Sequence, residues 1–175
     1  MITSGTGLVS ILVVLYCALL VACAVTDFLW LRIPNSLVAC LVALFFFCTV
    51  VTHAPVSLVR HVVPALVMFA FTVILFWFGK MPGGDVKLLT AATLWVGTAA
   101  LPNFLIWLGI AGFAVTLLFL ALRRPVERLF FRMQMRLGRS VRIPVSVARG
   151  QREIPYGIVI AAASIAVTDK IAVFA

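Results

Sequence analysis

Two aspartates stand at the ends of long apolar runs, where a charged side chain is costly unless it has a function. The chain has five Asp and Glu residues among 175. Asp27 follows an uncharged run that begins near residue 7, and Asp85 precedes another run from Leu88 to Leu101. An ionisable residue in a membrane segment costs at least a few kcal/mol and marks a candidate functional site. If these two carboxyl groups lie close together, they share a proton and titrate as a pair.

A carboxyl pair of this kind can hydrolyse a peptide bond. The ionised carboxylate takes a proton from water while the protonated partner polarises the scissile carbonyl. This route needs no covalent intermediate and no metal. The sequence offers no histidine-rich metal motif and no Ser or Cys nucleophile with an evident base. We therefore predict Asp27 and Asp85 as catalytic residues, with no cofactor and no metal.

The segment Lys80 to Leu88, KMPGGDVKL, surrounds the second aspartate with residues that suit a site. Gly83 and Gly84 lack Cβ, so an extended substrate can lie against the backbone there. Lys87 could stabilise the ionised pair or bind substrate, or it could be an interface anchor.

After the first aspartate, Pro34 restricts the residue before it and suits the first turn of the next helix. Asn35 follows it directly. We predict Pro34 and Asn35, like Gly83, Gly84 and Lys87, as supporting or substrate-proximal residues of the site. An ordinary interfacial turn in which Asp27 pairs with Arg32 is the alternative reading of this loop.

The elements that must position these residues are membrane helices. The chain is 65% hydrophobic and 11% charged, with a mean hydropathy of +1.24, which is typical of a polytopic membrane protein. A span needs about 20 apolar residues. We predict an all-α protein, a single membrane domain over residues 1–175, with six spans at approximately 7–26, 36–53, 62–79, 86–101, 103–122 and 156–174. Pro102–Asn103 is the predicted turn between the fourth and fifth spans.

Charge asymmetry predicts the orientation. If the basic loop 123–155 is cytoplasmic, alternating spans put twelve Lys and Arg residues inside and two, Arg60 and Lys170, outside. The N-terminus then lies outside, and Asp27 and Asp85 both face the cytoplasm. The loop 54–61 falls outside with His53 and His61 beside it, where no acidic or further histidine ligand accompanies them.

The basic segment begins with a second helical pattern. Arginines recur every four residues from Arg124 to Arg136, between apolar residues at three-and-four spacing. This pattern predicts an amphipathic helix lying at the membrane surface, ended by Gly138, with its arginines on anionic lipid. The net charge of +9 is therefore assigned to lipid headgroups and topology, and no nucleic-acid partner is expected.

Three motifs together resemble the type IV prepilin peptidases. The stretch from Pro82 to Leu89 resembles their GxGD signature with its V-K-L-type tail. Asp27 followed by Ile33-Pro34-Asn35 is similar to their first-aspartate motif. The stretch Ile154 to Gly157 is similar to the proline–aromatic–glycine turn that opens their last span. The motifs occur in order and cover essentially the whole chain.

The resemblance implies a membrane aspartic endopeptidase of the bacterial inner membrane with Asp27 and Asp85 as its catalytic pair. It would remove the short basic leader from prepilins or pseudopilins at the cytoplasmic face, commonly after a glycine. Pro82 replaces the first motif glycine. The inserted zinc domain of the larger, bifunctional members is absent, so no methyltransferase activity is expected. The short form resembles the peptidases of tight-adherence (Flp) pilus systems or the archaeal preflagellin peptidases.

Two other classes of function are compatible with six spans. A small proton-coupled transporter could use the two aspartates as relays, but its acids would be expected near the membrane midplane rather than at one face. A catalytically inactive assembly subunit would not need to retain both acids.

Overall fold

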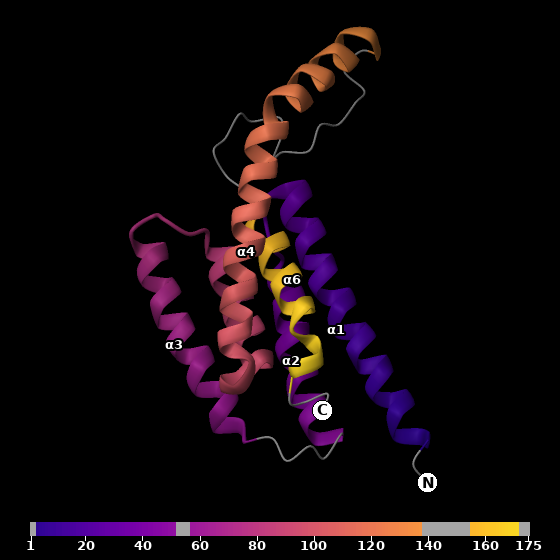
Figure 1. Cartoon of the computed structure of the whole chain (residues 1–175), viewed down its shortest axis with the longest axis vertical. Coiled ribbons are helices and arrows are strands. Elements are labelled where there is room, and N and C mark those ends of the chain that lie inside the picture. Colours follow the sequence, from indigo (N-terminus) through magenta and orange to yellow (C-terminus); the bar gives the residue numbers. More distant parts are fainter. Residues whose placement is uncertain (1–2, 52–56, 138–154, 172–175) are drawn as a thin grey trace.

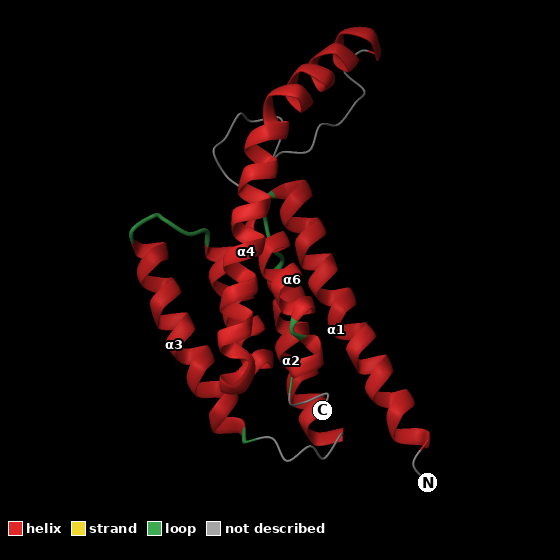
Figure 2. Ribbon diagram, in the orientation of Figure 1, coloured by secondary structure: helices red, strands yellow, loops and turns green. Residues whose placement is uncertain are grey.

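The protein is built entirely from helices in the part of the chain that its computed structural model describes, residues 3–51, 57–137 and 155–171. Side chains are described within 7–51, 57–118, 120–121 and 155–171. The helices are α1 (Thr3–Trp30), α2 (Asn35–Val51), α3 (Leu58–Trp77), α4 (Gly83–Leu137) and α6 (Tyr156–Ala166), followed by the short 3₁₀ helix η1 (Thr168–Lys170). They form one bundle (Figures 1 and 2).

Three of the described helices are long and apolar enough to cross a membrane. They comprise residues Gly7–Trp30, Leu58–Trp77 and Gly83–Leu118, and α2 and α6 are shorter apolar helices. At a rise of 1.5 Å per residue, α1 is about 40 Å long, more than the hydrocarbon core of a bilayer. The multiple apolar helices make this a membrane protein, while the number of crossings stays a prediction.

Helix α4 reverses direction at Gly97. Gly83 lies against Phe76 at the end of α3, whereas Gly97 lies against His61 near the start of α3. Further along, Gly112 lies against Val159 of α6. The residues before Gly97 therefore run antiparallel to α3, and those after it return toward the starting end (Figure 1).

Glycine is required at this reversal. The backbone of Gly97 has φ 63° and ψ −178°, a combination that residues with a Cβ rarely adopt. A Cβ at this position would also lie 2.6 Å from the His61 ring. His61 Nδ1 donates a hydrogen bond of 2.8 Å to the Leu94 carbonyl, which fixes the ring beside the turn.

Two predictions for this end of the bundle are wrong. The break between the fourth and fifth spans falls at Gly97 rather than at Pro102–Asn103, which are helical. Proline and asparagine favour turns, but the left-handed backbone of this reversal requires glycine. His61 belongs to α3 and is buried, although the sequence placed it at the edge of an outer loop.

The core centres on Trp95, which joins three helices. Its ring lies 4.5 Å from the ring of Tyr16 in α1 and 5.5 Å from that of Phe45 in α2, between centroids. Its indole Nε1 donates a hydrogen bond of 3.0 Å to the Leu41 carbonyl. All three rings are fully buried. The first half of α4 is thereby held between α1 and α2.

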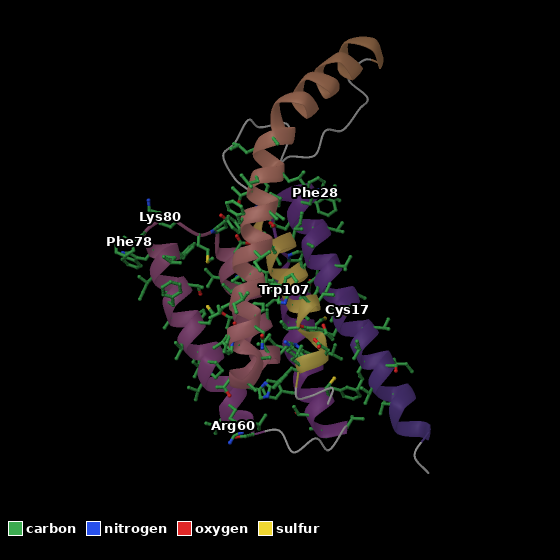
Figure 3. The ribbon with its side chains drawn as sticks, in the orientation of Figure 1. Cys17, Phe28, Arg60, Phe78, Lys80 and Trp107 are labelled. Atoms are coloured by element: carbon green, nitrogen blue, oxygen red, sulfur yellow. The ribbon has the colours of Figure 1, made fainter. Side chains whose placement is uncertain are left out.

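The two ends of the bundle carry different segments. Figure 3 shows Phe28, Phe78 and Lys80 at one end and Arg60 at the other. The later part of α4 extends beyond the bundle at the end that carries Phe28 (Figure 3). Its backbone runs without interruption into the predicted amphipathic helix and stops at Leu137, before Gly138. The rest of the basic loop, 138–154, lies outside the described residues.

The last predicted span is shorter than expected. Helix α6 ends at Ala166, and η1 occupies Thr168–Lys170, instead of one helix over 156–174. The first three expected spans agree with α1, α2 and α3 to within about four residues at each end. The fourth and fifth fall within α4, which continues to Leu137, fifteen residues past the expected end at 122.

Candidate active site

Asp27 lies in the last turn of α1, with only 5% of its surface exposed. The helix ends just after it, because Leu31 adopts the left-handed conformation with φ 49° while its N–H bonds the Asp27 carbonyl at 2.7 Å. This conformation costs a residue with a Cβ about 1–2 kcal/mol. The turn then leads through Ile33 and Pro34 into α2. No feature of the sequence indicated the unusual backbone at Leu31.

Asp85 lies in the first turn of α4 and is 2% exposed. A Cβ on Gly84 would come 3.4 Å from the side chain of Ile33, and one on Gly83 would come equally close to Phe76. The glycines were expected to leave room for an extended substrate. In the folded chain the bare faces of their Cα atoms are covered by the protein's own side chains. Gly84 allows the loop after Asp27 to pack directly against the turn that carries Asp85.

Both aspartates line one cavity of 470 Å³. The wall comes from the loop between α1 and α2 and from the start of α4. Its lining residues are Asp27, Leu31, Arg32, Ile33, Pro34, Asn35, Pro82, Gly83, Gly84, Asp85 and Lys87. Every residue that the sequence analysis proposed for the site is among them. Two carboxyl groups from segments far apart in the chain are therefore brought to one hollow at one end of the bundle.

A third element holds the first aspartate. The backbone N–H of Gly157, at the start of α6, donates a hydrogen bond of 2.7 Å to Asp27 Oδ2. A Cβ on Gly157 would lie 2.8 Å from both Cβ and Oδ2 of Asp27, too close for any side chain. Gly157 is a site residue that was not predicted from the sequence. The Pro155-Tyr156-Gly157 motif was the available signal, but this motif predicts only the start of a helix.

The carboxyl group of Asp27 therefore bonds to a backbone amide instead of to Arg32. Within the described residues, no ion pair joins Asp27 to Arg32. Arg32 is exposed, although it contributes to the wall of the cavity. The alternative reading of the loop, a simple interfacial Asp–Arg turn, is wrong.

Lys87 pairs with Asn35 at the mouth of the cavity. Its Nζ donates a hydrogen bond of 2.9 Å to Asn35 Oδ1, joining the start of α4 to the start of α2. The sequence left open whether Lys87 contacts the acid pair or substrate or anchors an interface. In the folded protein Lys87 donates to the side-chain oxygen of Asn35.

Two buried carboxyl groups that line one cavity between apolar helices are the arrangement expected of a membrane-embedded aspartic hydrolase. The chain belongs to the type IV leader peptidase family, whose sequence profile matches residues 14–117, a range that contains both aspartates. Members of this family are aspartic endopeptidases that cleave the leader peptide from prepilins, in the inner membrane. No curated protein and no solved structure shows a significant match to the chain.

Family membership decides against the transporter reading. The protein is a prepilin leader peptidase, and its substrates are prepilins. The matched range contains Asp27 but ends before α6, so Gly157, which donates its amide to Asp27, lies beyond the profile.

Proposed function

We propose that Asp27 and Asp85 are the catalytic pair that cleaves prepilin leader peptides. The observation that carries this proposal is the burial of both carboxyl groups in one cavity. A buried carboxyl group is costly, and two that face one hollow at 5% and 2% exposure are more costly still. A cavity of 470 Å³ has room for a water molecule and a short peptide segment beside the acids.

The roles of the two acids differ because their partners differ. Asp27 accepts the Gly157 amide, and a hydrogen bond from an N–H stabilises a carboxylate more than a neutral carboxyl group. In the proposed mechanism Asp27 is the base that takes a proton from water. Asp85, protonated, donates a hydrogen bond to the scissile carbonyl oxygen. The water oxygen attacks the scissile carbonyl carbon and forms a tetrahedral intermediate. The C–N bond then breaks as Asp27 returns the proton it took from water to the leaving nitrogen.

The length of the chain between its helices bears on the substrate class within the family. The chain has no inserted zinc domain between its helices, so it resembles the short peptidases of Flp pilus systems. We propose Flp-type prepilins or pseudopilins as substrates, leader cleavage without methylation as the reaction, and archaeal preflagellins as the second substrate candidate.

The orientation proposal follows from charge. Arg32 and Lys87 line the cavity, Lys80 lies at the same end of the bundle, and Arg60 lies at the other end (Figure 3). Positive residues concentrate on the cytoplasmic side of membrane proteins. We therefore propose that the cavity faces the cytoplasm, where a basic leader would be cleaved, and that the N-terminus lies outside. Anionic lipids are the proposed partners of the basic segment after Arg123.

The catalytic assignment is tested by co-expression with an Flp-type prepilin, using the mobility shift of leader removal. Asp27→Asn and Asp85→Asn keep the size of each side chain but remove its ability to exchange a proton. We expect each to lower the cleavage rate by at least about 1,000-fold, since both members of an acid pair are needed.

The matched control is Asp169→Asn, which changes an exposed aspartate in η1. It should cleave at the wild-type rate. Undiminished cleavage by either cavity variant would refute the catalytic assignment. Wild-type cleavage of a preflagellin but of no Flp-type prepilin would shift the substrate assignment to the second candidate.

A further inference from the structure

A second hollow of 470 Å³ lies along α2 beside the active-site cavity. We call it the α2 groove, and its lining residues are Asn35, Val38, Ala39, Val42 and Ala43 of α2 with Lys87 of α4. The five α2 positions recur at spacings of three, one, three and one residues, which places them on one face of the helix. Beyond its polar end, the wall is made only of valine and alanine.

The α2 groove adjoins the active-site cavity. Asn35 and Lys87 line both hollows. The hydrogen bond between them, 2.9 Å from Lys87 Nζ to Asn35 Oδ1, lies where the hollows meet. A chain that occupied the groove would therefore reach the two aspartates by passing this pair, without crossing another helix.

We infer that the α2 groove binds the apolar helix of the prepilin, directly after its leader, while the scissile bond lies in the active-site cavity. The inference rests on the proposed function and adds where the substrate docks. A membrane-embedded substrate must reach the acids from the side, and the groove is an apolar path that leads to them. Small side chains let two membrane helices approach closely, as Val38, Ala39, Val42 and Ala43 allow. The stretch from Asn35 to Ala43 is about 12 Å long, roughly two turns of a docked helix.

The polar end of the groove lies where the substrate helix must unwind. A peptide bond inside a helix is protected, and its freed N–H and C=O groups need hydrogen-bond partners when the helix opens in a membrane. The Asn35 amide and the Lys87 ammonium group provide a donor and acceptor set at this point. An apolar helix face is otherwise covered by lipid, and the connection to the aspartates is what distinguishes this face from the rest of the surface.

The test compares two substrates made from one Flp-type prepilin. One is the full-length prepilin in liposomes with the peptidase, and the other is a peptide that ends a few residues after the scissile bond and lacks the apolar helix. Ala39→Leu and Ala43→Leu fill the groove at two exposed positions. Each should lower the ratio of full-length to peptide cleavage by about tenfold, through KM rather than kcat.

Cys40→Leu is the matched control, because Cys40 is exposed on α2 but lies outside the groove. It should leave the ratio unchanged. An unchanged ratio in both groove variants would overturn the inference, and so would an equal loss on both substrates, which would indicate a distorted active site. A wild-type protein that cleaves neither substrate would instead overturn the proposed function, and the docking inference with it.

Discussion

At the scale of single residues, the site depends on glycines as much as on its two aspartates. Gly157 has no Cβ, so its amide can approach Asp27 Oδ2 to 2.7 Å. Gly84 has none, so Ile33 can pack against the turn before Asp85. Both contacts are between segments distant in sequence. The position of each carboxyl group is therefore set by glycines on other elements, in addition to its own helix.

Gly157→Ala should abolish most of the activity. The new methyl group would lie 2.8 Å from Asp27, so either the carboxyl group or the start of α6 must move. A displacement of about 1 Å at a catalytic group lowers the rate by about 100-fold. We expect a loss of at least this size in the prepilin cleavage assay.

Gly109→Ala is the control for Gly157→Ala, since no atom lies within 4 Å of a Cβ built at Gly109. It should retain wild-type cleavage, and both variants should be compared for thermal stability in detergent. Full activity of Gly157→Ala would show that the amide contact with Asp27 is not needed for catalysis.

At the scale of elements, the reversal of α4 brings its first turn back to the loop after α1. The first half of α4 runs along α3, is held by Trp95 between α1 and α2, and presents Asp85 beside Asp27. The second half returns toward the same end and packs against α6, which carries Gly157. Without the turn at Gly97, one continuous helix could not contact α3, α6 and the Asp27 loop in this arrangement.

Gly97→Ala should destabilise the protein. The positive φ costs an alanine about 1–2 kcal/mol, and its methyl group would overlap the His61 ring. Together these effects should lower the thermal midpoint in detergent by about 5 °C or more.

The double variant Gly97→Ala with His61→Ala separates the two causes. Removing the ring removes the overlap but leaves the strained backbone. The thermal midpoint of the double variant should therefore lie between those of the two single variants, Gly97→Ala and His61→Ala. A wild-type midpoint in Gly97→Ala would contradict the assignment of the chain reversal to this residue.

At the scale of the whole molecule, the two ends of the bundle carry different segments and different charged residues. The cavity, the Lys87–Asn35 pair and the extension of α4 occupy one end, and the Gly97 turn with His61 and Arg60 occupies the other (Figures 1 and 3). A leader peptidase with its acids at the basic end would act on the cytoplasmic side of the membrane, where the positively charged leader remains.

Cysteine labelling should show this orientation. Lys80→Cys and Arg60→Cys place thiols at exposed positions at opposite ends of the bundle. In intact cells a membrane-impermeant maleimide should label the Arg60 variant, and it should label the Lys80 variant only after the membrane is opened. The wild-type protein, which keeps its native cysteines, gives the background. The reverse pattern would place the cavity outside the cytoplasm.

Much of the site was predictable because its chemistry is unusual for the composition. In a chain this apolar, two aspartates at helix ends stand out. The alternation of the predicted spans across the membrane is enough to put both aspartates at the same face. Asn35, Lys87, Pro34 and the two glycines before Asp85 were proposed from their positions beside the acids, and all of them line the cavity.

The sequence by itself determined the helical class, the approximate helices and the two acids, because hydrophobic runs and rare charges are local properties of a chain. Only the tertiary structure decided the turn at Gly97, the partner of Lys87 and the contact of Gly157 with Asp27. Each of these depends on which surfaces meet after packing: His61 against Gly97, α2 against α4, and α6 against α1. A glycine in the sequence signals only that close approach is possible, and the fold decides which neighbour makes that approach.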